Sequence, residues 1–243
     1  MTPQPHTHHT HNHSHTEEHF SGSEIVRDIV IGMSDGLTVP FALAAGLTGA
    51  AQGNGVIVTA GLAEIVAGSI AMGLGGYLAG KTEIDHYASE LKREYMEVDL
   101  YPEREKQEVR DVFDEYGLSK ESTEAIVEEL AKDKDKWVKF MMRYELGLEQ
   151  PDINRARQSA LTIGISYIIG GIVPLSSYFP IFTDNAKDGF VYSCIITAIC
   201  LFVFGYFKTK IIGQPPIVGA FKTLLIGALA AGSAYIIAHL IGG

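Results

Sequence analysis

The chain contains very few cysteines. Its two thiols, Cys194 and Cys200, fall within one apolar stretch that is predicted to form a single helix. Two cysteines on one such helix cannot form a disulfide with each other. A disulfide framework is therefore excluded, and both thiols are expected to fill apolar space.

Basic residues are scarce as well. The 243 residues include 19 Lys and Arg against 29 Asp and Glu, which gives a net charge of −10 at pH 7. Most of the acidic excess falls in residues 81–157. Because nucleic-acid binding relies on a basic surface, no nucleic-acid partner is expected. An acidic surface favours cations as partners.

Charge is nearly absent from five apolar stretches, each of about 18–25 residues, the length that crosses a ~30 Å hydrocarbon layer. They cover residues 25–47, 56–78, 160–181, 190–207 and 217–241. The sequence therefore predicts an all-α integral membrane protein with five transmembrane helices in contact with lipid. No short apolar stretch with a small-residue cleavage site precedes the first span, so this span is expected to direct insertion.

Basic residues flank the spans unequally. With the N-terminus in the cytosol, only Lys187 lies on the opposite face, and the cytosolic face receives Arg27, Lys81, Arg155, Arg157, Lys208 and Lys210. Because Lys and Arg concentrate in short cytosolic flanks, this distribution favours a cytosolic N-terminus and a C-terminus on the other side. The acidic segment between the second and third spans is then cytosolic.

That segment, residues 81–152, predicts a small cytosolic helical domain inserted between spans two and three. About three helices fit its boundary signals, which are Pro102, Gly117, Ser119 or Ser122, Asp133 or Asp135, and Gly147. The first helix is expected to continue directly from the second span, because residues 80–98 contain no proline. Asp152 is expected to cap the helix that leads into the third span. Residues 23–80 then hold spans one and two, and residues 153–243 hold spans three to five.

Residues 1–22 form a polar tail with too little apolar surface to fold alone, so we expect it to be disordered. Its imidazoles either hold a metal loosely or have no specific role. The histidines of this tail are His6, His8, His9, His11, His13, His15 and His19.

Two carboxylates, Asp35 and Glu64, lie inside the first and second spans. Because a charge in hydrocarbon is costly, an intramembrane Asp or Glu usually serves ion movement. The chain is therefore predicted to be a transporter and not an enzyme. Helical spacing puts a stripe on each span, with a glycine that leaves room for a ligand or a partner backbone. The stripes are Asp28, Gly32 and Asp35, and Glu64, Gly68 and Met72.

Pro40 adds a backbone acceptor beside Asp35, because proline has no N–H to donate to the carbonyl of Gly36. A carboxylate, a free carbonyl and the thioether of Met72 suit a divalent transition metal better than sodium or potassium, since thioether is a soft ligand. Iron(II) fits this mixture. Metal and proton bind the same carboxylate oxygens, so proton-coupled exchange is expected.

Simpler interpretations exist for single residues. Asp28, next to Arg27, can be an ordinary helix-end charge. Met72 can be core filler. Lys222 in the fifth span can pair with one of the two intramembrane carboxylates.

Small residues in the second and fifth spans predict close helix contacts. They are Gly73, Gly75, Gly76 and Gly80, and Gly227, Ala231 and Gly232. Because five spans provide few walls for a pore, we expect a homodimer with the path at its two-fold interface.

The cytosolic segment also contains pairs of possible metal ligands at helical spacing. Side chains three or four residues apart face the same side of a helix. This holds for Glu94 and Glu97, for Glu105 and Glu108, and for Met141, Met142 and Glu145. Brought together, these side chains would form a multi-metal pocket with sulfur at one edge. Taken singly, acidic stripes are usually solvated faces.

Three segments resemble the vacuolar iron transporter family, in particular its plant-type members with a cytosolic metal-binding domain. They are SEIVRDIVIGMSDGLTVPFALAAGL, GLAEIVAGSIAMGLGGYLAGKTEIDHYASELKRE and WVKFMMRYELGLEQPD, and the resemblance covers residues 23–243. It implies a dimer with five spans per subunit that exchanges cytosolic Fe²⁺ for protons, in the vacuolar membrane of a eukaryote or the plasma membrane of a bacterium.

The resemblance also implies site residues. The membrane metal site would consist of Asp35, Glu64 and Met72. The cytosolic site would consist of Glu94, Glu97, Glu105, Glu108, Met141, Met142 and Glu145. Nothing carries over to the histidine-rich tail.

Two other classes of protein remain as alternatives. A membrane-anchored di-iron, ferroxidase-like enzyme needs two Glu-x-x-His pairs, and the segment has one, Glu83 with His86. A metal sensor would bind the ion and move nothing. No prosthetic group is expected, since Fe²⁺ is a substrate, and carboxylates accept Mn²⁺, Co²⁺ and Zn²⁺ as well.

Overall fold

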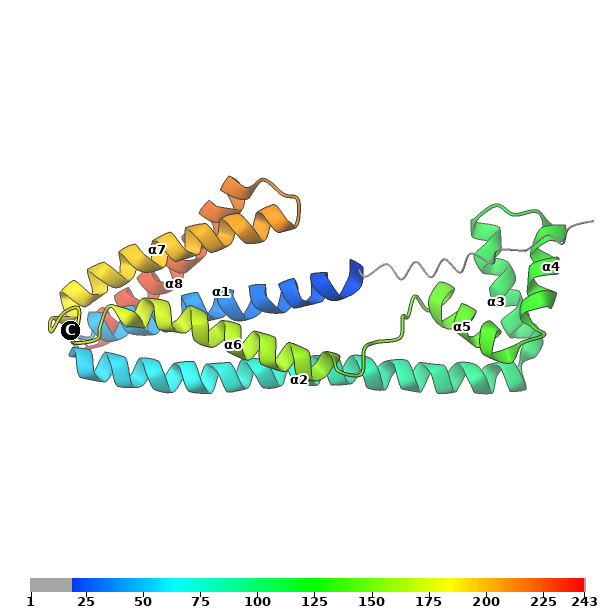
Figure 1. The fold of residues 1–243 in the computed structure, drawn as a ribbon, viewed down its shortest axis with the longest axis horizontal. Helices are drawn as coiled ribbons and strands as arrows, with labels where there is room; N and C mark the ends of the chain where they lie inside the picture. The colour runs from blue at the N-terminus through cyan, green and yellow to red at the C-terminus, as the bar shows by residue number, and fades with distance from the viewer. Residues whose placement is uncertain (1–18, 243) are drawn as a thin grey trace, which may run out of the picture.

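The computed structural model describes residues 19–242, which form eight α-helices and no strand (Figure 1). Five of them contain a stretch long and apolar enough to cross a membrane. These are α1 (His19–Gly49), α2 (Asn54–Leu100), α6 (Arg155–Ser176), α7 (Ala186–Ile211) and α8 (Pro216–Gly242). The prediction of an all-helical chain with five long apolar helices is confirmed. Of the predicted tail, residues 1–18 lie outside the described residues, and α1 begins at His19.

The five long helices form one bundle. Helix α6 packs between α1 and α2, α8 packs against α1, and α7 packs against α8. Glycines bring α1 and α6 together, because a Cβ at Gly32 would lie 2.3 Å from the carbonyl oxygen of Ile163, and one at Gly36 equally close to that of Tyr167. The space beside Gly32 therefore holds the backbone of a neighbouring helix and not a ligand.

The small-residue stripe of α2 serves the same purpose. A Cβ at Gly73 would come 2.9 Å from the carbonyl oxygen of Ala160, and one at Gly80 would come 2.8 Å from the Cα of Ala156, both on α6. Gly75 has open space around it. Most of the glycines predicted to make close helix contacts are thus used for packing inside one chain, because close backbone contact in a membrane bundle needs small residues.

Helix α2 is much longer than a membrane span. Its 47 residues reach roughly 70 Å at ~1.5 Å per residue, whereas hydrocarbon is ~30 Å thick. The helix runs along the bundle and continues without interruption to a group of three short helices at its far end (Figure 1). The expected continuation of the second span is confirmed, and it follows from the absence of proline in this stretch.

The three short helices are α3 (Pro102–Glu115), α4 (Lys120–Leu130) and α5 (Lys134–Tyr144). The side chain of Ser119 accepts a hydrogen bond from the Ser122 N–H at the start of α4, and Asp133 accepts one from the Lys136 N–H at the start of α5. Gly117 has a φ of +72°, which favours glycine and ends the helical path after α3. The apolar core of this helical domain comprises Val98, Val109, Val127, Trp137, Val138, Met141 and Met142.

The third span differs from its predicted position. It was expected at residues 160–181, but α6 begins at Arg155 and ends at Ser176. Pro180 follows in the turn after α6, a position where proline is common. The expected cap is also different: Asn154 occupies the N-cap position, and the Asp152 carboxylate accepts a hydrogen bond from the Asn154 N–H at 2.9 Å.

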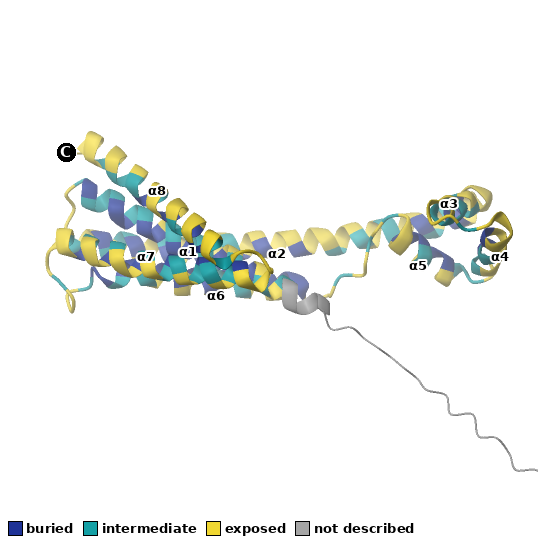
Figure 2. Ribbon diagram, turned by 90° about the horizontal axis from the view of Figure 1, so that it is seen from above, coloured by how far each residue is buried: buried dark blue, intermediate teal, exposed yellow. Residues whose placement is uncertain are grey.

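Large apolar side chains cover the outside of the bundle. Ile70, Leu161 and Leu225 are 65%, 65% and 59% exposed, and exposed residues follow the outer faces of α7 and α8 (Figure 2). Water disfavours so large an apolar surface, whereas lipid does not. The bundle is therefore the membrane part of the molecule.

Candidate metal-binding sites

The helical domain brings three glutamates together where α2 turns into α3. Glu94 and Glu97 lie on the last turns of α2, and Glu105 lies on the first turn of α3 after the Pro102 start. One oxygen from each carboxylate lies within 4.8 Å of the others. We call these three residues the glutamate cluster. Within residues 19–242 it is the only group of three or more His, Cys, Asp or Glu side chains this close.

The glutamate cluster has an excess of acceptors. Glu94 and Glu105 are each 1% exposed. Both oxygens of Glu105 and the Oε2 of Glu94 are buried without a hydrogen-bond partner. Arg93 is the cation beside them, with its Nε 3.3 Å from Glu97 Oε2 and its Nη2 3.6 Å from Glu94 Oε1. Because buried oxygens without partners are costly, the cluster is suited to a cation or to protons.

Two of the other predicted ligands of the domain, Glu108 and Glu145, lie near this cluster. Burial raises the pKa of Glu105 to about 7, and the charges of Glu108 and Glu94 add to the effect. Burial also raises the pKa of Glu145 to about 7, with Glu108 and Glu94 again contributing. Glu108 accepts a hydrogen bond from Arg104 Nε at 3.1 Å. Met141 and Met142 are buried in the apolar core of the domain.

The three residues predicted to form the membrane site lie on α1 and α2. Asp35 is half-buried on α1, and Glu64 and Met72 are half-buried on α2. Eight residues of helix separate Glu64 from Met72, about 12 Å at ~1.5 Å per residue. Such a spacing suits successive positions along a path better than a single coordination shell.

Glu64 has a partner on a third helix. The Tyr167 hydroxyl on α6 donates a hydrogen bond to Glu64 Oε1, while Glu64 Oε2 is buried without a partner. Among the described residues, neither Asp35 nor Glu64 forms an ion pair. The suggested pairing with Lys222 is wrong, because this residue is exposed on α8 and bonds to neither carboxylate.

Asp28, in contrast, is paired. The guanidinium of Arg155 donates to both of its oxygens, with Nη1 to Oδ2 at 2.6 Å and Nη2 to Oδ1 at 3.1 Å. Arg155 also lies 2.8 Å from Glu24 through its Nε. Arg27, the neighbour in the sequence, is exposed and reaches Asp28 only at 4.0 Å. Asp28 is 2% exposed and Arg155 4%, so the pair is a buried link between α1 and α6.

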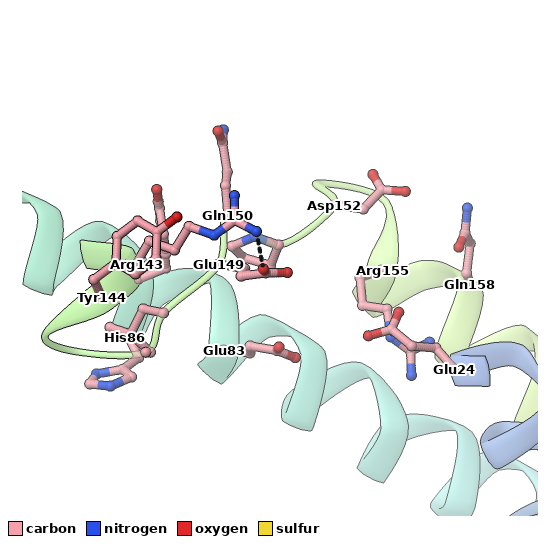
Figure 3. A pocket seen from close by; sticks show the side chains of 14 residues that line it. Glu24, Glu83, His86, Arg143, Tyr144, Glu149, Gln150, Asp152, Arg155 and Gln158 are labelled. Atoms are coloured by element: carbon pink, nitrogen blue, oxygen red, sulfur yellow. Dashed lines mark ion pairs between the residues drawn. The ribbon is translucent and has the colours of Figure 1, made fainter. Parts of the chain in front are cut away.

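Two cavities meet at this ion pair. The part of α2 between the bundle and the helical domain is called the stalk here. The first cavity, about 650 Å³, lies between this stalk, the chain after α5 and the start of α6 (Figure 3). Its polar lining includes Glu24, Glu83, His86, Glu149 and Arg155. The second, about 490 Å³, is a groove between α1 and α2 that is lined by Asp28 and Met72. Both cavities share Glu83 and Arg155 in their lining.

Sequence reasoning missed two residues of these sites. In the sequence, Arg155 has the position of a charge that flanks a span, and Tyr167 belongs to no motif. Neither residue has a local signal, because each becomes informative only when α6 packs against α1 and α2.

The Glu-x-x-His pair of the enzyme alternative is exposed, and His86 Nδ1 lies 3.9 Å from Glu90 and outside the glutamate cluster.

Comparison with known proteins gives a consistent result. The model of the VIT family matches residues 26–239. The chain is 51% identical over 226 residues to "Vacuolar iron transporter 1" of Arabidopsis thaliana, which covers 93% of this chain and 90% of the relative. It is 48% identical over 230 residues to "Vacuolar iron transporter 1" of Oryza sativa subsp. japonica (95% and 89%), and 38% identical over 226 residues to "Protein CCC1" of Saccharomyces cerevisiae (90% and 69%).

Proposed function

The chain belongs to the VIT family, and on this premise we propose that it moves Fe²⁺ across a membrane in exchange for protons. Its similar relatives are named as vacuolar iron transporters, so the protein is a transporter and not an enzyme. This agrees with the resemblance found in the sequence.

One observation carries the proton-coupled mechanism. Glu64 Oε2 is buried at membrane depth and has no hydrogen-bond partner in residues 19–242. A carboxylate oxygen in such a position gains by binding either a cation or a proton, and it cannot bind both at once. Alternate occupation by Fe²⁺ and H⁺ at Glu64, with Asp35 as the second carboxylate, couples the two movements.

We assign the glutamate cluster to metal collection on the cytosolic side. Glu108, Glu145, Met141 and Met142 extend its ligand set, and the first cavity lies between the cluster and the bundle. Carboxylate with thioether suits divalent transition metals, so Mn²⁺, Co²⁺ and Zn²⁺ are secondary substrates. The basic residues that flank the spans support a cytosolic N-terminus and a cytosolic helical domain. The host membrane is the vacuolar membrane in a eukaryote or the plasma membrane in a bacterium.

We further infer a homodimer. The groove that holds Asp28 and Met72 opens on the surface of the single chain, where Ala71 and Gly75 are exposed. The groove is mostly apolar, but charged residues such as Asp28 and Glu83 line part of it. Charged groups facing lipid are costly, and a second copy would cover them. In a chain with Cys194→Ala and Cys200→Ala, Ala71→Cys is expected to give cross-linked dimers with a short reagent, whereas Val203→Cys on α7 is not. Equal yields from both would contradict this interface.

The transport proposal is tested in proteoliposomes with an acidic lumen. Wild-type protein is expected to accumulate Fe²⁺ while the lumen becomes more alkaline, since protons leave as metal enters. Asp35→Ala and Glu64→Ala are each expected to abolish uptake, whereas Asp184→Ala, in an exposed loop, is a control with normal uptake.

Fe²⁺ uptake that does not depend on the pH difference would exclude antiport. Normal uptake in both variants would exclude the membrane site, and no flux in the wild type would favour a sensor.

A further inference from the structure

Tyr167 is an almost fully buried tyrosine beside the proposed path. It is 2% exposed, and its hydroxyl crosses from α6 to α2 to donate a hydrogen bond to Glu64 Oε1. The second oxygen of the same carboxylate, Oε2, remains buried without a partner. Glu64 therefore has one oxygen occupied by protein and one oxygen available.

Two glycines fix the position of this tyrosine. A Cβ at Gly68, one turn after Glu64, would lie 2.5 Å from the Tyr167 hydroxyl oxygen. A Cβ at Gly36, next to Asp35, would lie 2.3 Å from the Tyr167 carbonyl oxygen. The phenol thus rests in a notch of α2, while its backbone contacts α1 beside the other intramembrane carboxylate. Tyr167 connects the two helices that carry Asp35 and Glu64.

We propose that Tyr167 is a positioning residue that makes Glu64 a ligand through a single oxygen, and that it thereby selects small transition-metal ions against Ca²⁺. This inference rests on the proposed function. Ca²⁺ takes six to eight oxygens and often binds a carboxylate through both of them. The Tyr167 hydroxyl occupies one acceptor site of Oε1 and fixes the orientation of the carboxylate, so Oε2 is the oxygen placed to approach an ion. A metal that needs few ligands loses little by this arrangement, whereas Ca²⁺ loses one of its contacts.

The main test compares two tyrosine variants in Fe²⁺ uptake by proteoliposomes, with and without excess Ca²⁺. Tyr167→Phe removes only the hydroxyl. Tyr178→Phe is the matched control, because Tyr178 is also fully buried and its hydroxyl also shares a hydrogen bond, with Thr48 at 3.2 Å. Tyr167→Phe is expected to raise the KM for Fe²⁺ about tenfold, the size expected for loss of a hydrogen bond to a charged group. It is also expected to make Ca²⁺ a stronger competitor by a similar factor, while Tyr178→Phe leaves both values unchanged.

A second variant reaches the same bond from the other side. Gly68→Ala keeps the tyrosine but displaces its hydroxyl, so it is expected to reproduce the weaker Fe²⁺ uptake and the stronger Ca²⁺ competition. Unchanged KM and unchanged Ca²⁺ competition in Tyr167→Phe would overturn the proposal and leave the tyrosine a packing role only.

A binding measurement separates this inference from the proposed function. In solubilised protein with Glu94→Gln, Glu97→Gln, Glu105→Gln, Glu108→Gln and Glu145→Gln, the proposed carboxylate ligands of the helical domain are removed and Mn²⁺ affinity reports the membrane site. Adding Tyr167→Phe is expected to weaken Mn²⁺ binding about tenfold, even if the wild type transports nothing. Unchanged Mn²⁺ affinity in this background would overturn the inference whether or not the protein transports metal.

Discussion

At the scale of single residues, the three carboxylates of the membrane bundle, Asp28, Asp35 and Glu64, have different surroundings. Asp28 is neutralised by Arg155 through two hydrogen bonds, whereas Glu64 accepts one bond from a neutral hydroxyl and keeps a free oxygen. Helical spacing in the sequence places Asp28 and Asp35 on one stripe and leaves open whether Asp28 is an ordinary helix-end charge. The structure divides them into a structural charge and a candidate ligand, because only Asp28 lies opposite a guanidinium.

Removal of the Asp28 charge is expected to destabilise the bundle. Asp28→Asn leaves the buried Arg155 without its main partner, and loss of one member of a buried pair costs about 3–5 kcal/mol. Glu24→Gln is the matched control, since Glu24 is a more exposed partner of the same guanidinium, 24% exposed at its side chain, and such pairs contribute about 0–1 kcal/mol. Thermal unfolding in detergent measures both. Equal loss of stability in the two variants would contradict the assignment of Asp28 as the main partner.

The raised pKa values of two glutamates in the helical domain predict that the stability of the metal-free protein depends on pH. The pKa values of Glu105 and Glu145 are raised to about 7 from 4.5, so the folded state holds protons that the unfolded chain has released. These groups therefore contribute stability below about pH 4.5 that is lost as the pH rises through about 7. Circular dichroism on metal-free protein should show easier unfolding at pH 8 than at pH 5.

Two additions check the origin of this effect. Mn²⁺ is expected to restore stability at pH 8, because the ion replaces the lost protons. Glu105→Gln is expected to reduce the difference between pH 5 and pH 8. A metal-free domain whose stability rises steadily from pH 5 to pH 8 would contradict the raised pKa values as the dominant effect.

At the scale of elements, helix α6 organises the molecule. It contacts α1 and α2, and it supplies both Arg155 and Tyr167. Its close approach depends on glycines of the neighbouring helices. The sequence contains these glycines, but their partner could not be identified, because small residues serve contact inside one chain and contact between chains equally well.

Filling one of these contacts is expected to separate the helices. Gly36→Ala would place a Cβ 2.3 Å from a backbone oxygen of α6, so the helices must move apart. Overpacking of this kind costs about 1–3 kcal/mol, a fall in unfolding midpoint of roughly 5 °C. Gly232→Ala on α8 has open space around it and is the control. This control should be neutral or slightly stabilising, since alanine favours helix more than glycine does. An unchanged midpoint for Gly36→Ala would show that α1 and α6 contact less closely.

At the scale of the whole molecule, α2 joins two parts with different solvents. Its first half packs in a bundle with an apolar outside, and its last turns carry the buried Glu94 and the half-buried Glu97 into the helical domain. A continuous helix holds the two parts at a fixed separation. The glutamate cluster and the groove of the bundle are therefore connected by a stiff element with the first cavity beside it.

A break in this stalk is expected to reduce transport without removing metal binding. Ala88→Pro removes one helical hydrogen bond and clashes with the preceding turn, a local cost of about 3 kcal/mol or more. Fe²⁺ uptake should fall, while Mn²⁺ binding to the helical domain should persist. Ala88→Leu changes the same exposed position without breaking the helix and should behave as the wild type. If uptake by Ala88→Pro is normal, the cluster acts without a rigid connection to the bundle.

The sequence alone determined the helical class, the five apolar spans, the long continuation of α2 and the family. Each of these depends on composition, periodicity or local chain chemistry, which every residue carries with it. It also paired Glu94 with Glu97 and Glu105 with Glu108, because helical spacing is a local feature.

Only the tertiary structure decided which polar groups are satisfied and which remain available. The pairing of Asp28 with Arg155 joins residues 127 positions apart, and that of Glu64 with Tyr167 joins residues 103 apart. Such pairs depend on how three helices pack, and the glycines that permit this packing do not name their partners. The chemistry of a buried carboxylate is set by its neighbours in space, so the difference between a structural charge and a ligand lies outside the reach of sequence spacing.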